Sequence, residues 1–322
     1  MTYVWFVIGV VLTLTGATWL VDGASGIAKR YGVSEFVIGV AIVGIGTSMP
    51  ELTVSMLGSL KGSDGIALGN VTGSNIFNTL LILGVTALIN PILFTKVNLR
   101  KDMHLNTLAS LILVLFAFVP LALHPSGQME ISTLEGVIFL VLFGLYLMMT
   151  FASGASQEDS ETSEEAAAAD MPKPLWKLIF MVIAGISALV AGGKLFVDKG
   201  CEIARALHVS ETVIAITFMA CGTSLPELVT CIIAAAKKRN QLALGNILGS
   251  NVSNILLILG CSALVQPLAV DAINLAGFVA MAAVAVLLYI SAFLPPRNIL
   301  GRYKGVVFII LYIAYIWYTV IA

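Results

Sequence analysis

The chain has 322 residues, of which 59% are hydrophobic and only 11% are charged, and its mean hydropathy is +1.00. Soluble domains carry roughly 25% charged residues, so this composition excludes an ordinary soluble protein and predicts an integral membrane protein. A net charge of -1 without a long basic run predicts no nucleic-acid partner.

Ten apolar stretches follow one another along the chain, each of about 20 residues, the length with which a helix spans a bilayer. They cover residues 3–25, 33–60, 66–89, 104–123, 131–151, 175–198, 209–236, 242–265, 271–294 and 303–322. The pattern predicts an all-α integral membrane protein with ten transmembrane helices. We expect it in the cell membrane, either the inner or the plasma membrane, with lipid as its surroundings.

A polar stretch, "SGASQEDSETSEEAAAADMPKP" at 153–174, separates the first five helices from the last five. Its acidic, proline-terminated composition cannot bury enough apolar surface to order itself, which predicts a flexible linker. The chain thus divides into residues 1–152, the linker 153–174 and residues 175–322. With the N-terminus outside, 13 of the 17 lysines and arginines fall in inner loops. The positive-inside rule therefore predicts a cytoplasmic linker and both termini outside.

The two halves repeat each other. Residues 33–91 align with residues 209–267 at a fixed offset of 176 without a gap, and 28 of the 59 positions are identical. The match reaches back to Asp22 and Asp198, which we expect at the membrane interface. Since each half has five helices, an odd number, the second copy enters the membrane from the opposite side. The sequence therefore predicts two inverted five-helix repeats, an architecture of alternating-access transporters with a site at the midplane.

Polar residues interrupt the second helix of each half. In "GTSMPE", residues 46–51, the side chains of Thr47, Ser48 and Glu51 project toward one region of a helix. Pro50 lacks an N–H and is expected to kink the helix and free the carbonyl of Gly46. "GTSLPE" at 222–227 repeats the arrangement with Thr223, Ser224, Pro226 and Glu227. An ionisable group inside a membrane is costly, and such groups usually serve a function.

The third helix of each half adds further oxygen atoms. It holds "GNVTGSNIFN" at 69–78 and "GNILGSNVSN" at 245–254, where Ser74 and Asn78, and likewise Ser250 and Asn254, stand four residues apart on one face. Hydroxyl, amide and carboxylate oxygens are hard donors, and Ca²⁺ binds roughly six to eight of them in flexible geometry. The two motifs therefore predict a cation site built from both halves.

The same residues also admit roles that involve no cation. Glu51 and Glu227 could pair with basic residues, although none lies within nine positions of either. The asparagines could simply bond helices together. An intramembrane hydrolase would need a catalytic dyad or a metal cluster, whereas His104, His124 and His208 are scattered and no HExxH motif occurs. A cation channel of the same fold is a further alternative. We therefore expect a transporter and no enzyme.

The paired "GTSMPE" and "GTSLPE", each followed by "GNVTGSN" or "GNILGSN", resemble the two α-repeats of the calcium/cation antiporter superfamily, most closely its sodium/calcium exchanger branch of bacterial and archaeal type. The resemblance implies four cation sites between helices 2, 3, 7 and 8, with Ca²⁺ at the centre and Na⁺ beside it. It implies an antiporter whose only non-protein groups are the transported ions. The sister branch, which exchanges H⁺ for Ca²⁺, is the alternative, but it usually has an acidic residue after the "GN".

The resemblance also assigns ligands by motif position. Glu51 and Glu227 would be the carboxylates shared by Ca²⁺ and Na⁺, and Thr47 and Thr223 would join them at Ca²⁺. Further oxygens would come from Ser48, Ser224, Ser74, Ser250, Asn78 and Asn254, and from the main chain of Gly44 and Ala220. Some relatives, including potassium-dependent exchangers, have aspartate in place of Asn78 or Asn254. This difference predicts exchange without potassium, while stoichiometry, affinity, flux direction, regulation and oligomeric state do not follow from the sequence.

Overall fold

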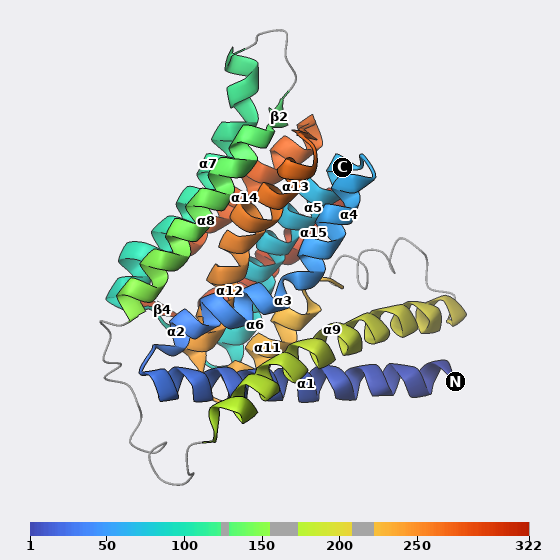
Figure 1. Ribbon diagram of the computed structural model, residues 1–322, viewed down its shortest axis with the longest axis vertical. Helices are drawn as coiled ribbons and strands as arrows, with labels where there is room; N and C mark the ends of the chain where they lie inside the picture. The colour runs from blue at the N-terminus through green and yellow to red at the C-terminus, as the bar shows by residue number, and fades with distance from the viewer. Residues whose placement is uncertain (124–128, 155–172, 208–221, 322) are drawn as a thin grey trace.

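The computed structural model describes residues 1–123, 129–154, 173–207 and 222–321, and it is helical almost throughout (Figure 1). Its elements, in chain order, are α1 (Thr2–Tyr31), α2 (Glu35–Ile38), the π-helix η1 (Gly39–Gly44), α3 (Ile45–Thr47), α4 (Met49–Leu60), α5 (Asp64–Ile76), η2 (Phe77–Ile82), α6 (Leu83–Ile89), β1 (Ile92–Leu93), η3 (Asn98–Asp102), α7 (Met103–Leu123), β2 (Glu130–Ile131), α8 (Thr133–Gly154), α9 (Leu175–Ala206), α11 (Leu225–Ala236), α12 (Asn240–Ser253), η6 (Asn254–Leu259), α13 (Gly260–Val265), β3 (Leu268–Ala269), α14 (Ala272–Ser291), β4 (Ile299–Leu300) and α15 (Arg302–Ile321).

Within these ranges, seven helices are long and apolar enough to cross a membrane, and the bent pair formed by 35–47 and 49–60 raises the count to eight. The expected tenth span coincides with α15, and the end of the expected seventh span coincides with α11. The first part of that seventh span, with Ala220, and most of the expected linker lie outside the described residues. The predicted helical membrane fold is confirmed, and the total of ten spans stays a prediction.

α1 and α9 lie alongside each other and cross the remaining helices steeply, as a separate layer on one side of the bundle (Figure 1). Small residues allow the two backbones to approach closely. A Cβ added at Gly16 would lie 2.7 Å from the backbone nitrogen of Leu189, and one added at Gly185 would lie 2.7 Å from that of Leu20. Any larger residue at either position would push the two helices apart.

The second expected helix is bent where the sequence predicts. Its two parts, 35–47 and 49–60, meet at an angle of 46° at Ser48, whose φ and ψ are −81° and 6°. Pro50 lies in the first turn of α4, where its missing N–H costs no hydrogen bond. Ser224 has nearly the same backbone angles, −88° and 8°, and Pro226 lies in the first turn of α11. Each acidic motif thus begins a new helix.

The third and eighth helices form the centre of the bundle, and each changes from α to π geometry midway. The change comes at Phe77 in one and at Asn254 in the other. Such π-turns are frequent at functional sites. α12 packs so closely on α2 that a Cβ on Gly245 would lie 2.2 Å from the carbonyl oxygen of Phe36. α5 also packs against α4 and α12 against α11, so each central helix lies beside an acidic motif.

Two small antiparallel sheets, which the sequence analysis did not predict, tie the halves of the chain together. Ile92 pairs with Leu300 between β1 and β4, and Ile131 pairs with Leu268 between β2 and β3. Each strand has two residues, too few for an alternating pattern to be visible in a sequence. Both sheets join a strand of the first half to one of the second.

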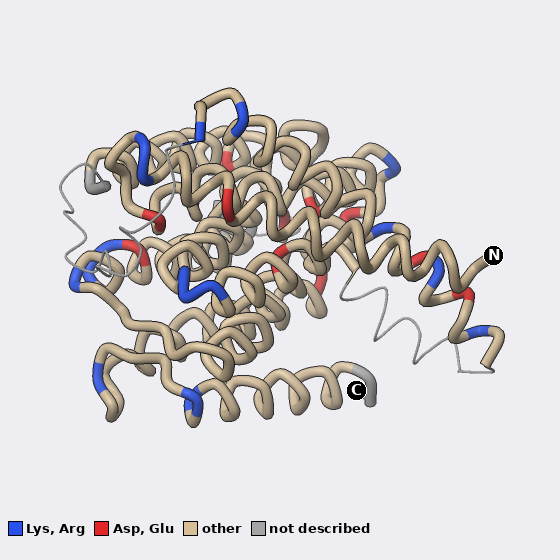
Figure 2. Tube along the Cα trace, turned by 90° about the horizontal axis from the view of Figure 1, so that it is seen from below, with Lys and Arg blue, Asp and Glu red and all other residues tan. Residues whose placement is uncertain are grey.

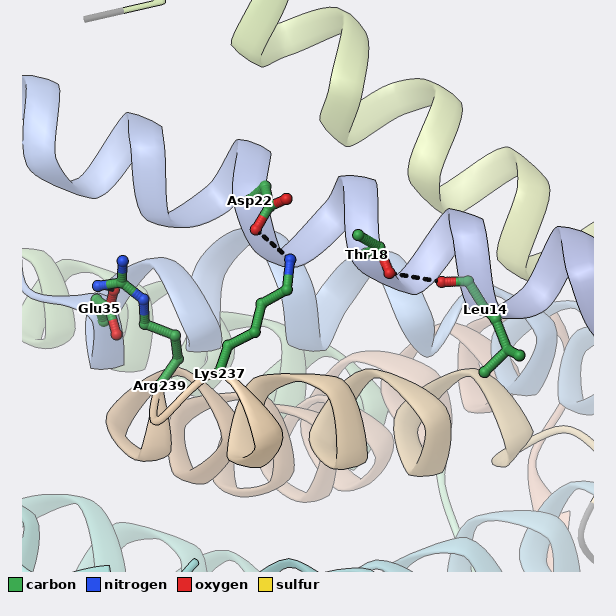
Figure 3. Close-up of polar contacts among 6 residues, drawn as sticks. All are labelled: Leu14, Thr18, Asp22, Glu35, Lys237 and Arg239. Carbon is green, nitrogen blue, oxygen red and sulfur yellow. Dashed lines mark hydrogen bonds and ion pairs between the residues drawn. The ribbon is translucent and has the colours of Figure 1, made fainter. Parts of the chain in front are cut away.

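Charged residues follow the arrangement expected of a membrane protein. Lysines and arginines lie mainly at helix ends and in loops, whereas some acidic residues lie along helices within the bundle (Figure 2). Two ion pairs connect the first helices to the turn after α11 (Figure 3). Lys237 Nζ lies 2.5 Å from Asp22 Oδ1, and Arg239 Nη1 lies 2.7 Å from Glu35 Oε1. Asp22 is therefore a partner of the opposite half of the chain and lies outside the polar centre.

Candidate functional site

The two motif glutamates are buried at the starts of helices. Glu51 lies in the first turn of α4 and Glu227 in the first turn of α11, and each is only 1% exposed. A carboxylate is stabilised near a helix N-terminus by the partial positive charge there. Neither glutamate forms an ion pair with a lysine or arginine of the described chain. Within that part of the chain, the structural salt bridge considered above does not form.

Each glutamate is instead held by a serine from the other motif. Ser224 Oγ donates to Glu51 Oε1 at 2.9 Å, and Ser48 Oγ donates to Glu227 Oε1 at 3.1 Å. Ser224 Oγ also lies 3.0 Å from Ser74 Oγ, whose hydroxyl can donate to it, and this contact brings the third helix to the same point. Two motifs 176 residues apart in the sequence therefore form one polar centre.

The remaining predicted hydroxyls line the same region, although their present hydrogen bonds are to neighbouring protein groups. Thr47 Oγ1 lies 3.0 Å from the carbonyl oxygen of Val43 and 3.2 Å from Asn246 Oδ1, and its single proton can be donated to either. Thr223 Oγ1 donates to Asn70 Oδ1 at 3.3 Å. Ser250 Oγ donates to the carbonyl oxygen of Gly44 at 3.2 Å, which joins two predicted ligands directly.

Four asparagines of the central helices complete the centre. Asn78 and Asn254, the two predicted from the sequence, are each 1% exposed. Asn78 Nδ2 donates to Asn251 Oδ1 at 3.2 Å, and Asn254 Nδ2 donates to Asn75 Oδ1 at 2.9 Å. The amide groups of the two predicted ligands are therefore fixed by two asparagines from the opposite repeat.

Four buried oxygens at this centre receive no hydrogen bond: Glu51 Oε2, Glu227 Oε2, Asn78 Oδ1 and Asn254 Oδ1. A buried oxygen without a donor is costly, and a cation can satisfy it in place of a hydrogen bond. The described residues form no cluster of three or more His, Cys, Asp or Glu side chains. The centre thus offers two formal negative charges and neutral hard oxygens, which suits Ca²⁺ or Na⁺ better than a transition metal.

Sequence reasoning did not assign a role to Asn70, Asn246, Asn75 or Asn251. Asn70 Nδ2 donates to the main-chain oxygen of Glu51 at 3.1 Å and to Ser55 Oγ at 2.9 Å, so it supports the start of α4. Asn246 Nδ2 contacts Cys231 Sγ at 3.3 Å. A signal was available, since these asparagines are among the positions identical in both repeats, but which helix each one faces is not visible in a sequence.

Comparison with known proteins identifies the family. The model of the sodium/calcium exchanger protein family matches residues 1–152 and 177–321. The chain belongs to the sodium/calcium exchanger family. It is 33% identical over 343 residues to the sodium/calcium exchanger MaX1 of Methanosarcina acetivorans, with 96% of this chain and 95% of the relative covered. It is also 37% identical over 309 residues to an uncharacterized membrane protein of Methanocaldococcus jannaschii, with 96% and 95% covered.

The fold of this exchanger-family protein matches a solved structure as well. The sodium-calcium exchanger NCX_Mj, soaked with 2.5 mM Na⁺ and 1 mM Sr²⁺, superposes with a TM-score of 0.80 at 32% identity, covering 98% of this chain and 97% of the other. The resemblance noted in the sequence is therefore confirmed. MaX1 and NCX_Mj are exchangers, so the expectation of a membrane antiporter and no enzyme is confirmed too.

Proposed function

We propose that this protein exchanges Na⁺ for Ca²⁺ across the membrane by alternating access, with Glu51 and Glu227 as the carboxylates that both ions share. The observation that carries the proposal is the set of four buried oxygens without a hydrogen-bond donor, two from these glutamates and two from Asn78 and Asn254. They come from both halves of the chain, and the two formal charges of the glutamates balance one divalent ion. The family and the named relatives support the same substrates.

The hydroxyls and main-chain oxygens complete the proposed sites. Thr47 and Thr223 join the glutamates at Ca²⁺, and Ser48 and Ser224 bind beside them. Ser74, Ser250 and the main chain of Gly44 and Ala220 belong to the outer Na⁺ sites. The contacts Ser224–Ser74 and Ser250–Gly44, at 3.0 and 3.2 Å, support this grouping for the described members.

The ten helices are proposed to form two inverted repeats, 1–152 and 175–322, joined by the cytoplasmic linker 153–174. Reciprocal contacts support a two-fold axis. Ser48 contacts Glu227 while Ser224 contacts Glu51, and Thr47 contacts Asn246 while Thr223 contacts Asn70. Such exchange of partners is what a two-fold relation produces, because position i meets position j and j meets i. The two small sheets follow the same rule.

With both termini outside, the packing of α1 on α11 supports a state that is closed on the cytoplasmic side. α1 packs along α11 there, and the Asp22–Lys237 ion pair crosses the contact. On the opposite side, α9 makes no comparable contact with α4 among the described residues. The repeats are thus in different arrangements, and an exchange of these arrangements would open the other side.

Sodium is the favoured coupling ion, and H⁺ is the alternative. The "GN" of each central helix is followed by Val71 and Ile247, where the proton-coupled branch usually has an acidic residue. The described part of the chain also brings no third carboxylate into the centre to act as a proton carrier. Both observations favour two ion sets competing for the same pair of glutamates.

Calcium uptake into proteoliposomes tests the proposal. Vesicles loaded with Na⁺ should take up Ca²⁺ from a sodium-free buffer, and Glu51→Gln vesicles should not. An imposed membrane potential should change the rate if net charge moves in each cycle. Uptake driven by a proton gradient alone would favour the H⁺ alternative, and uptake without any counter-ion would favour a channel.

A further inference from the structure

Four asparagines, Asn75, Asn78, Asn251 and Asn254, form a buried network between the two central helices. Each is no more than 2% exposed. The two hydrogen bonds between side chains run in a reciprocal pattern, from Asn78 Nδ2 to Asn251 Oδ1 and from Asn254 Nδ2 to Asn75 Oδ1. Asn78 and Asn254 are the ligands assigned above, whereas Asn75 and Asn251 lie behind them and have had no role so far.

The orientation of an asparagine amide decides whether it attracts or repels a cation. The group has a carbonyl oxygen at one end and an NH₂ at the other, and the two ends have nearly the same shape. The torsion that interchanges them is broad, so packing alone selects weakly between the two orientations. An acceptor placed behind the amide holds the NH₂ and leaves the oxygen facing forward. In this structure, the NH₂ groups of Asn78 and Asn254 donate to the other two asparagines, and their Oδ1 atoms have no donor.

Asn75 and Asn251, the two rear asparagines, are themselves held by hydrogen bonds. Asn251 Nδ2 donates to Thr79 Oγ1 at 2.9 Å. Asn75 Nδ2 donates to the carbonyl oxygen of Asn251 at 3.1 Å and lies 3.3 Å from Met281 Sδ. Because each rear NH₂ already has an acceptor, each rear Oδ1 is left to receive the NH₂ of a front asparagine. The direction of the hydrogen bonds in the whole network is thus set by the acceptors that hold the NH₂ groups of Asn75 and Asn251.

We propose that Asn75 and Asn251 are positioning residues that orient the amides of Asn254 and Asn78 so that both present oxygen, and not NH₂, to the transported cation. The inference rests on the proposed function, since it requires a cation in front of the two amides. It assigns a specific role to two asparagines that could otherwise serve only to bond helices together. Each repeat then orients a ligand of the other.

The first test removes one rear acceptor. Asn251→Leu keeps a branched side chain but cannot accept from Asn78, whose amide is then free to turn its NH₂ toward the ion. Loss of a supporting residue behind a metal ligand weakens affinity about 10- to 100-fold. Calcium binding to the purified protein, measured by isothermal titration calorimetry, should weaken by that amount. Asn251→Asp keeps the acceptor and adds a negative charge, so it should bind Ca²⁺ at least as tightly as the native protein. Asn106→Leu is the matched control, because Asn106 is a buried asparagine on α7 with no hydrogen bond to the site.

A double variant separates orientation from simple packing. In Asn78→Asp both outer atoms are oxygens, so no orientation remains to be fixed. Adding Asn251→Leu to Asn78→Asp should therefore weaken calcium affinity by no more than about twofold, so the two effects should not add as they would for independent sites. If the double variant loses as much affinity as Asn251→Leu does alone, the network only packs helices and the inference is wrong. Unchanged affinity in Asn251→Leu would also overturn it.

A second variant covers the case in which Asn251→Leu does not fold. Thr79→Val removes only the acceptor for the NH₂ of Asn251, whereas Thr79→Ser keeps a hydroxyl. We expect weaker calcium binding in the first and native binding in the second, and equal binding in both would overturn the inference. Glu51→Gln distinguishes a failure of the proposed cation site from a failure of the positioning role. If native protein binds Ca²⁺ and Glu51→Gln does not, the proposed site holds whatever the asparagine variants do.

Discussion

The ion pair between Lys237 and Asp22 predicts that matching lysine substitutions in the two repeats shift the ratio of the two transport states in opposite directions. At the repeat offset of 176, Lys237 matches Lys61 and Asp22 matches Asp198. The first pair is formed, with Nζ 2.5 Å from Oδ1, but Lys61 and Asp198 form no ion pair with each other in the described structure. If the repeats exchange arrangements during transport, the Lys61–Asp198 pair should form when the Lys237–Asp22 pair breaks.

The expected size of this shift follows from the solvent exposure of the two paired side chains. The side chains of Lys237 and Asp22 are 35% and 37% exposed, so water and salt screen their attraction. An ion pair of this kind contributes about 0.2 to 1 kcal/mol. Its loss should therefore change the ratio of the two states by roughly 1.4- to 5-fold, since 1.4 kcal/mol corresponds to a factor of about ten. Lys237→Ala should favour the state open to the cytoplasm, and Lys61→Ala should favour the state described above.

The measurement is the apparent calcium affinity on each face of vesicles with a uniform protein orientation. The ratio of the two affinities reports the ratio of the two states, because only the state open to a given side binds ions from it. Lys238→Ala is the control, since Lys238 lies beside Lys237 and forms no ion pair within the described chain. High salt should reduce both effects. Shifts of the same sign in Lys237→Ala and Lys61→Ala would refute the reasoning.

Three further outcomes are expected. Glu51→Gln and Glu227→Gln should each abolish calcium flux without lowering the thermal unfolding temperature, since each keeps volume but removes half the charge that balances the ion; retained flux would contradict the site assignment. Acidification from about pH 8 to about pH 5 should weaken calcium binding competitively, because a protonated carboxyl no longer attracts a cation; a flat affinity would count against this. Sodium-driven calcium flux should not require potassium. Asn254→Asp or Asn78→Asp should raise cation affinity and slow release through a third negative charge. A strict potassium requirement, or unchanged affinity in both variants, would show that these asparagines do not bind the ion.

Much of the polar centre could be predicted because each motif occurs twice, once in each repeat. Glu51 and Glu227 are conspicuous in apolar helices, and Pro50 predicts the bend that the structure places at Ser48. The serine on the neighbouring motif that holds each glutamate is a tertiary contact, and no spacing within one motif reveals it. The direction of an amide is less visible still. Asn75 and Asn78 look alike in a sequence, yet Oδ1 of Asn75 accepts from Asn254 while Oδ1 of Asn78 has no donor.

The layer formed by α1 and α9 is another feature that the sequence did not predict. Its glycines are spread along helices that otherwise read as ordinary lipid-facing spans, and only their close approach, such as Gly16 against Leu189, explains them. The two small sheets are hidden for a different reason. Strands of two residues, such as β1 and β4, are stabilised by pairing across the repeats and not by their own sequence.

The charge of the centre explains why exchange, and not a one-way leak, is the expected behaviour under the proposed function. Two buried carboxylates without a basic partner are costly when ionised, so a site without cations should resist the closed intermediate through which the repeats must pass. One Ca²⁺ balances both charges. Three Na⁺ in the same place would leave one excess positive charge, worth about 2.3 kcal/mol per 100 mV of membrane potential. Either ion set lowers the barrier that the two glutamates raise, but both cannot occupy them together. Each passage of one set is therefore followed by the return of the other.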